Sequence, residues 1–283
     1  MITEDTRFLI VGLGLIGGSY ARGLSKKGFW VDAIDTDAAS ISYALENGLI
    51  RRGAARPDPA LTRSADIVVF ALYPTVMIGW LRQNQALFRP GTLLTDVSGV
   101  KCHVVDVIQG FLREDLEFIG SHPMAGKEVY GVRNSDEAIF RAANFIVTPT
   151  EKNTPEAVQT AREIGRLLEF RTVSELSPAA HDEIIGFVSQ LTHAIAVSLM
   201  TCNEDENLQN YTGDSFRDLT RIARINEKMW SELFLLNRQE LIEQIDSFTG
   251  ELLRMRGMLE REDRPALEEM FIHSTRRRAL FDR

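Results

Sequence analysis

The feature that most constrains the fold is a glycine-rich segment near the start of the chain. Gly12, Gly14 and Gly17 directly follow the apolar run Phe8–Val11 and open a helical pattern. In the G-x-G-x-x-G fingerprint of dinucleotide-binding domains, the first glycine makes a tight turn and the second lets a pyrophosphate approach the backbone. The third glycine lets the helix pack closely on the strand. The segment therefore predicts a βαβ unit that binds a dinucleotide.

Asp35 indicates which dinucleotide this unit binds. It directly follows the second apolar run, Trp30–Ile34. A carboxylate at this place accepts hydrogen bonds from both ribose hydroxyls and repels a 2′-phosphate, and no arginine follows it in the next few residues. We therefore expect NAD rather than NADP, with its phosphates held by the N–H groups of the first helical turn, around Leu15 and Ile16.

Short apolar runs alternate with helical patterns up to residue 176, which predicts a doubly wound, Rossmann-type α/β domain with a parallel sheet. The candidate strands are Phe8–Val11, Trp30–Ile34, Asp66–Ala71, Thr92–Thr95, Glu117–Gly120, Asn144–Pro149 and Phe170–Val173. The candidate helices between them are Gly17–Lys26, Ala38–Asn47, Thr75–Asn84 and Thr154–Leu168.

From residue 177 to residue 283 the apolar residues recur at three- and four-residue spacing, which predicts an all-helical second domain. A long helix begins at Ser177-Pro178 and continues past Leu199, and it is apolar on more than one face. We expect other helices or a second subunit to enclose it. Further helices are expected over Phe216–Ile225, Glu227–Leu259 and Pro265–Leu280.

Composition excludes several classes of partner. Forty acidic and 32 basic side chains give a net charge of −8, which repels polyphosphate backbones, so we expect no nucleic-acid partner. No apolar run approaches the ~18 residues that span a bilayer, so we expect no membrane partner and a cytoplasmic location. Cys102 and Cys202 form no C-x-x-C pair, and we expect buried thiols rather than a disulfide or a metal site.

Polar residues follow several candidate strands at the edge where such domains bind ligands. Tyr73 and Pro74 follow the third long strand and either wall the cofactor or pack the loop. Ser98 follows the next strand, in a segment of small residues that suits close approach to a ligand. His122 follows the strand Glu117–Gly120, and a histidine is the usual base for a hydroxyl proton while hydride leaves the same carbon. From the residues alone, a structural role for His122 is an equal alternative.

Four segments together carry a family resemblance: Gly12–Ser19, Asp96–Lys101, Ser121–Gly126 and Phe216–Ala223. Segments of this kind occur in the same order in the prephenate/arogenate dehydrogenase family of tyrosine biosynthesis, which the chain resembles along nearly its whole length. The resemblance implies a Rossmann-type domain over residues 1–176 and a helical substrate-binding and dimerisation domain over 177–283. It also implies a homodimer that catalyses the NAD-dependent oxidative decarboxylation of prephenate to 4-hydroxyphenylpyruvate, or of arogenate to tyrosine.

The resemblance assigns roles to particular residues. His122 would take the ring hydroxyl proton. His193 and Arg221 would bind substrate carboxylates, and a guanidinium suits a carboxylate because it can donate two parallel hydrogen bonds. His181 would bind substrate near the junction of the domains, and Glu128 would lie at the entrance of the active site.

Two positions depart from the family pattern. Family members often carry Gly-Ser before Val-Lys, with the serine beside the catalytic histidine, whereas this chain has Ser98-Gly99. We expect Ser98, a water molecule or another hydroxyl to fill that role. Asp214 stands where several members have glycine, and a carboxylate near the substrate side chain would favour the amino group of arogenate over a keto acid.

Two alternatives to this function are open. Another NAD-dependent dehydrogenase of small molecules would take its base from the helical domain and would leave His122 without a purpose. A binding module that senses NAD would need neither a base nor anion-binding residues. The combination of His122, His193 and Arg221 therefore favours an enzyme.

Overall fold

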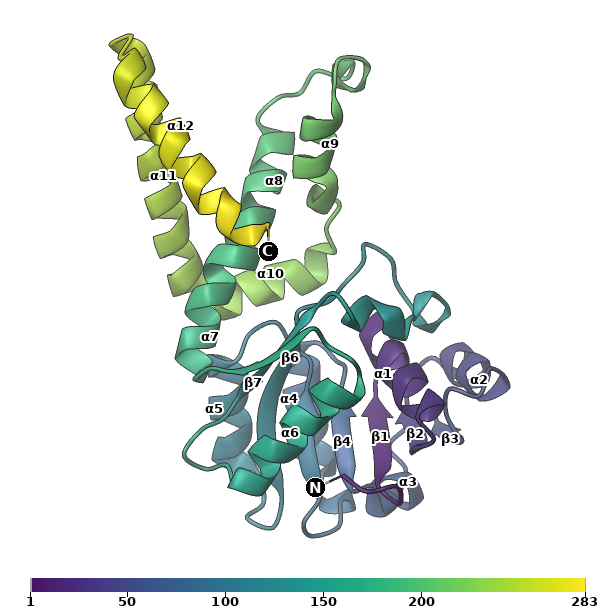
Figure 1. Ribbon diagram of the computed structural model, residues 1–283. Helices are drawn as coiled ribbons and strands as arrows, with labels where there is room; N and C mark the ends of the chain where they lie inside the picture. Colours follow the sequence, from purple (N-terminus) through teal and green to yellow (C-terminus); the bar gives the residue numbers. More distant parts are fainter. Residues whose placement is uncertain (1, 283) are drawn as a thin grey trace.

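The computed structural model describes residues 2–282 and has two parts, a sheet domain and a helical arm (Figure 1). The sheet has eight strands in the order β3-β2-β1-β4-β5-β6-β7-β8. The strands are β1 (Arg7–Val11), β2 (Trp30–Ile34), β3 (Arg52–Ala54), β4 (Ile67–Phe70), β5 (Leu93–Asp96), β6 (Glu117–Pro123), β7 (Asn144–Thr148) and β8 (Thr172–Glu175). The order of the first six strands is that of a dinucleotide-binding domain, and it confirms the predicted Rossmann-type fold.

The sheet differs from the prediction in two respects. Strand β7 runs antiparallel to β6, so the sheet is mixed rather than wholly parallel. Strand β3 was missed because its three residues, Arg-Gly-Ala, carry almost no apolar signal. An apolar run does not reveal the direction of a strand, which is why the reversal at β7 was not expected.

Helices cover both faces of the sheet and form two cores. The helices are α1 (Leu15–Lys26), α2 (Ala38–Glu46), α3 (Pro59–Ser64), α4 (Pro74–Asn84), α5 (Cys102–Phe111) and α6 (Pro155–Leu167). Tyr20 of α1, Ile41 of α2 and Ile164 of α6 belong to the core on one face. Met77 of α4 and Val104 of α5 belong to the core on the other face, so the sheet is enclosed as its apolar strands require.

The second part of the chain is all-helical, as predicted. It contains α7 (Pro178–Ile185), the π-helical turn η4 (Gly186–Leu191), α8 (Thr192–Thr201), α9 (Asp214–Thr220), the short turn η6 (Arg221–Ala223), α10 (Glu227–Leu236), α11 (Arg238–Glu260) and α12 (Arg264–Arg278). The single helix expected over Glu227–Leu259 is broken at Asn237, whose side-chain N–H groups bond to Asp182 O and Gln190 Oε1 at 2.9 Å. Leu233 of α10 joins a core of the sheet domain and ties the two parts together.

The expectation about apolar length was wrong for the first long helix. Pro178–Thr201 is one continuous helical run whose length and composition would suffice for a membrane span, and 28% of its apolar 18-residue stretch is buried inside this chain. One such helix is weak evidence for a membrane, because a helix that packs in a protein interior has the same composition. Its partly exposed apolar surface fits the expectation of a second subunit.

The expectation of buried cysteines was also wrong, since Cys102 and Cys202 are both exposed. Cys102 begins α5 and Cys202 follows α8, so both lie at helix ends rather than in a core. Desolvation and the nearby Asp182 carboxylate raise the pKa of the Cys102 thiol to about 12. This thiol therefore stays protonated near neutral pH.

The hairpin of α11 and α12 projects away from the sheet domain and leaves large apolar side chains uncovered (Figure 1). Leu252, Leu253 and Leu259 are exposed on α11, and Phe271 and Ile272 are exposed on α12. An uncovered apolar surface of this extent is typical of an interface.

We expect the purified chain to have the mass of a dimer in light scattering, and Phe271→Glu to raise the monomer fraction, because the new carboxylate loses hydration in an apolar interface. The matched control is Gln83→Glu, which adds the same charge at an exposed position of α4. A monomeric wild-type chain at micromolar concentration would contradict the expectation.

Candidate active site

The glycine-rich turn between β1 and α1 has the shape that a pyrophosphate requires. Gly12 has a positive φ of 99°, and a Cβ there would lie 2.4 Å from the carbonyl oxygen of Ala71. A Cβ on Gly17 would lie 1.9 Å from the carbonyl oxygen of Gly12, so neither position accepts a side chain. Gly14 is the N-cap of α1, has open space in front of it and provides no side-chain cap. The first-turn N–H groups, including those of Leu15 and Ile16, therefore remain available to an anion.

Asp35 lies beside this turn, at the carboxyl end of β2. Its carboxylate accepts the N–H of Leu13 at 2.5 Å and the N–H of Asp37 at 2.8 Å. These bonds hold both oxygens beside the glycine turn, and each oxygen keeps a further lone pair for a ribose hydroxyl. The geometry fits the predicted role of Asp35, as it does for the glycines.

Tyr73 and Pro74 begin α4 at the carboxyl end of β4, next to the glycine turn. Pro74 is buried at the first helical position, and Tyr73 is exposed. The Tyr73 hydroxyl accepts a hydrogen bond from Asn226 at 3.2 Å, and the N–H of Thr75 bonds to Glu232 at 2.7 Å. These residues therefore contact the helical arm, in addition to any contact with a cofactor.

A buried ion pair fills the carboxyl end of β5. Lys101 Nζ lies 2.5 Å from Asp96 Oδ2, and both side chains are fully buried. The other carboxylate oxygen of Asp96 accepts the N–H of Ser121 on β6 at 3.1 Å. The pairing of β5 with β6 ends at Ile119, so this carboxylate takes the place of the next strand-to-strand hydrogen bond.

Ser98 belongs to this buried cluster and not to the surroundings of His122. Its hydroxyl donates to the Asp96 carboxylate and lies 3.2 Å from Lys101 Nζ. Of the three partners expected for His122, the structure does not support Ser98, because its hydroxyl is committed to the ion pair. Gly99 occupies that place instead: a Cβ there would lie 3.8 Å from His122 Nε2.

His122 is half-buried on β6, beyond the point where β5 and β6 separate. Its Nδ1 lies 2.9 Å from Nε2 of His181. Desolvation lowers the pKa of His122 well below its ordinary value, and the neighbouring His181 and Lys101 act in the same direction. The ring is therefore neutral near neutral pH, which is the form that a base requires.

His181 is placed behind His122 rather than against a substrate. It is fully buried on α7, and its Nδ1 lies 2.7 Å from Asp182 Oδ1. Both ring nitrogens are thus occupied, so the prediction that His181 binds substrate is wrong. Asp182 also accepts the N–H groups of Lys101 and Cys102, each at 2.8 Å, and so caps α5.

His193, Arg221 and Glu128 are brought together by the helical arm and the loop after β6. The Arg221 guanidinium forms an ion pair with the Glu128 carboxylate. Desolvation lowers the pKa of His193; the Glu128 charge raises this pKa and the Arg221 charge lowers it. The His193 ring stacks on Trp230 with 3.7 Å between the ring centroids, and its Nδ1 lies 2.8 Å from Ser189 O. This leaves Nε2 of His193 and most of the exposed guanidinium of Arg221 for an anion.

Asp214 lies apart from this group. Its side chain is 90% exposed at the start of α9 and pairs with Arg217 of the same helix at 2.5 Å. Because the carboxylate faces water and a counter-charge of its own helix, the structure does not support the predicted contact with the substrate side chain.

Comparison with known proteins now identifies the group to which the chain belongs. Residues 20–173 match the family model "Prephenate dehydrogenase, nucleotide-binding domain", and residues 177–273 match "Prephenate dehydrogenase, dimerization domain". The chain belongs to the prephenate dehydrogenase family.

Several known proteins are similar to nearly the whole of this chain. The chain is 30% identical over 275 residues to the prephenate dehydrogenase of Bacillus subtilis, across 95% of this chain and 74% of that protein. It is 25% identical over 287 residues to the cyclohexadienyl dehydrogenase of Zymomonas mobilis, across 98% and 96% of the two chains. The solved structure of A. aeolicus prephenate dehydrogenase with hydroxyphenyl propionate and NAD+ aligns with a TM-score of 0.90 and 27% identity, over 98% of this chain and 99% of that one.

Membership of the prephenate dehydrogenase family makes the protein an oxidoreductase with a nucleotide-binding domain and a dimerisation domain. Three features of the site were not predicted from the sequence: the buried pair of Asp96 and Lys101, Asp182 as the partner of His181, and Trp230 as the stacking partner of His193. Of these, the buried pair had a signal in the sequence, which is the Asp-x-x-x-x-Lys spacing at the end of a candidate strand.

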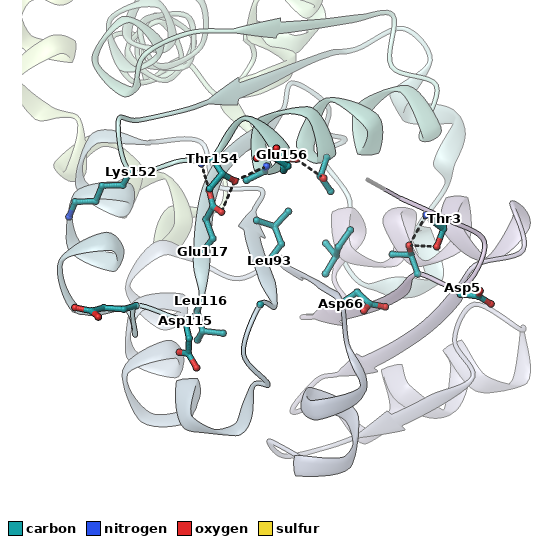
Figure 2. Close-up of a pocket in the computed structure, with 16 residues that line it drawn as sticks. Thr3, Asp5, Asp66, Leu93, Asp115, Leu116, Glu117, Lys152, Thr154 and Glu156 are labelled. Carbon is teal, nitrogen blue, oxygen red and sulfur yellow. Dashed lines mark hydrogen bonds between the residues drawn. The ribbon is translucent and has the colours of Figure 1, made fainter.

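A second hollow lies at the opposite edge of the sheet (Figure 2). This cavity of about 640 Å³ is lined by residues at the amino ends of the strands, among them Ile67, Leu93 and Glu117. Figure 2 shows Asp5, Asp66 and other acidic side chains around it. Ligands of doubly wound sheets bind at the carboxyl ends of the strands, so this cavity is not the active site of the prephenate dehydrogenase fold.

We expect Asp96→Asn to lower the free energy of unfolding by about 3–5 kcal/mol, because it leaves the Lys101 charge buried without its partner. Urea denaturation measures the loss, and replacing both residues together, Asp96→Asn with Lys101→Met, should recover part of it. Glu268→Gln removes an exposed ion pair with Arg264 and is the control, with little expected change. A loss below about 1 kcal/mol in Asp96→Asn would show that the pair is not desolvated.

Proposed function

We propose that the protein oxidises prephenate or arogenate with NAD, with His122 as the base for the ring hydroxyl. The observation that carries this proposal is the meeting of four features at one edge of the sheet. A nucleotide-binding turn and a neutral histidine come from the sheet domain, and an arginine and a second histidine come from the helical arm. A sensor of NAD would use the first of these features and would have no need of the others.

The residues at the glycine turn fit NAD. Gly12 and Gly17 exclude side chains from the turn, the uncapped start of α1 offers N–H groups to the pyrophosphate, and Asp35 offers a carboxylate to the ribose hydroxyls. The same carboxylate repels the extra phosphate of NADP. When bound, NAD accepts hydride from the ring carbon that bears the hydroxyl group.

His122 removes the hydroxyl proton as the carbon–oxygen double bond forms. Its Nε2 lies next to Gly99, 3.8 Å from where a Cβ of that residue would be, so Gly99 itself places no side chain between the ring and a substrate hydroxyl. The lowered pKa keeps the ring neutral before the reaction. The ring carboxylate of the substrate then leaves as carbon dioxide and its bonding electrons make the ring aromatic, so this step needs no further acid or base.

Arg221 and His193 bind the carboxylates of the substrate. Without substrate, the guanidinium is held by Glu128, which keeps it at the mouth of the site. The planar guanidinium carries five N–H donors, so it can donate to a substrate carboxylate in one direction and to Glu128 in another. Stacking on Trp230 fixes the His193 ring, so less rotational freedom is lost when an anion binds.

The test of this function is NADH formation by the purified protein with NAD and either prephenate or arogenate. We expect turnover of at least one substrate, and His122→Asn to lower kcat by about 10²–10⁴-fold with NAD binding unchanged, because asparagine cannot accept a proton. His273→Asn, on the exposed face of α12, is the control. A folded, NAD-binding wild-type protein that turns over neither substrate would contradict the proposal.

For Arg221 we expect the conservative change to lysine to raise KM about tenfold with a smaller effect on kcat, because lysine keeps the charge and loses the paired hydrogen bonds. Arg217→Lys is the matched control, since Arg217 pairs with Asp214 on the outer helix α9. An unchanged KM in Arg221→Lys would remove Arg221 from the substrate site.

A further inference from the structure

Three side chains form a continuous line of hydrogen bonds behind the base. His122 Nδ1 lies 2.9 Å from His181 Nε2, and His181 Nδ1 lies 2.7 Å from Asp182 Oδ1. His181 is fully buried and Asp182 is 2% exposed, so water does not compete for these bonds. The line begins in the sheet domain, on β6, and ends in the helical arm, on α7.

The donors and acceptors in this line determine where its protons lie. Burial raises the pKa of Asp182, but hydrogen bonds from His181 and from backbone N–H groups outweigh it and lower the pKa overall. An ionised carboxylate only accepts, so His181 carries its proton on Nδ1 and its neutral Nε2 accepts. His122 must then carry its proton on Nδ1, which leaves the lone pair on Nε2. That is the nitrogen that faces the space above Gly99.

The charges around the two rings are unequal. Desolvation, His181 and Lys101 all lower the pKa of His122, and no carboxylate within residues 2–282 is among the groups that shift it. His181 is also desolvated and is opposed by Lys101, but the hydrogen bond to Asp182 and the charges of Asp182 and Asp96 favour its cation. A positive charge therefore costs less free energy on His181 than on His122.

We propose, on the basis of the function proposed above, that His181 is a positioning residue that receives the proton from His122 during catalysis. The substrate O–H bond breaks and an Nε2–H bond forms on His122. The Nδ1–H bond of His122 breaks and an Nε2–H bond forms on His181. His122 ends neutral, and the positive charge rests on His181 beside the Asp182 carboxylate. After the product leaves, the proton returns to His122 Nδ1 and the Nε2 proton passes to water.

Asp182 links this transfer to the assembly of the two domains. Its side chain caps α5 through Lys101 and Cys102, and its backbone carbonyl accepts a hydrogen bond from Asn237 between α10 and α11. The π-helical turn η4 follows α7 directly, a feature that is frequent at functional sites. The histidine pair is thus aligned only when the helical arm is seated on the sheet domain.

The test compares the full-length wild type with His181→Gln. Glutamine can accept the Nδ1–H of His122 through its side-chain oxygen, but it cannot take up a proton. We expect a 10–100-fold lower single-turnover rate of NADH formation, with KM within about twofold and NAD affinity unchanged. His103→Gln, at an exposed histidine on α5, is the matched control and should behave as wild type.

Single-turnover rates measured in mixtures of light and heavy water distinguish proton transfer to His181 from a purely structural role of this residue. The wild-type single-turnover rate should depend on the deuterium fraction along a curve, since two protons move, and the rate of His181→Gln should depend on it linearly. A linear dependence in the wild type, or a His181→Gln rate within twofold of wild type, would overturn the proposal.

A measurement without substrate keeps this proposal distinct from the proposed function. Nitrogen-15 NMR of labelled histidines in the wild-type protein should show His122 neutral with its proton on Nδ1 and His181 as the first of the pair to be protonated as pH falls. A proton on Nε2 of neutral His122 would overturn the proposal whether or not either substrate is turned over. A wild type that shows the expected protonation but turns over neither substrate would refute the proposed function alone.

Discussion

The buried ion pair of Asp96 and Lys101 is the interaction on which the active site depends. Both side chains are fully excluded from water, so each charge is tolerated only because the other is present. The Asp96 carboxylate also replaces the lost hydrogen bond between β5 and β6 by accepting the N–H of Ser121. The two strands can therefore separate just before His122 without leaving a buried donor unsatisfied, and the His122 side chain is half-buried just past that point.

Lys101 also influences the protonation of His122. Lys101 carries a positive charge near His122 and disfavours the protonated ring, while its backbone N–H is held by Asp182. Position and protonation state of His122 are thus coupled through one residue. A substitution of Lys101 therefore cannot change the charge near His122 alone, because the packing, the ion pair and the backbone contact of Lys101 change with it.

Neither domain contains a complete site. The nucleotide turn and His122 belong to the sheet domain, whereas His181, Asp182, His193 and Arg221 belong to the helical arm. Leu233, Asn237 and the bonds from α4 to Asn226 and Glu232 hold the two parts in register. The contacts between the domains are therefore of two kinds: Leu233 and its apolar neighbours on α10 bury area, and the hydrogen bonds of Asn226, Glu232 and Asn237 orient side chains.

The sequence was sufficient to predict the features that depend on residues close together along the chain. The glycine turn, the alternation of strands and helices and the change to helices near residue 177 follow from steric limits and from apolar periodicity. The proposals that His122 is the base and that His193 and Arg221 bind anions depended on resemblance to a family, because a histidine in an apolar stretch has many structural uses. The predicted roles of Ser98, His181 and Asp214 were wrong because each role depends on the direction in which one side chain points. Hydrogen bonds across the fold decide that direction, and the spacing of residues along the chain does not record them.

The order Ser98-Gly99, where family members often have Gly-Ser, changes which groups surround His122. Ser98 satisfies the buried Asp96 carboxylate, so its hydroxyl serves the stability of the turn and is closed to the substrate. Gly99 stands beside Leu233 and His122 with ordinary contact distances for an added Cβ, so steric exclusion does not explain the absence of a side chain there. In the proposed function, the hydroxyl of the substrate is the partner of His122 Nε2. The opposite side of the His122 ring is held by the contact of its Nδ1 with His181, which in turn contacts Asp182.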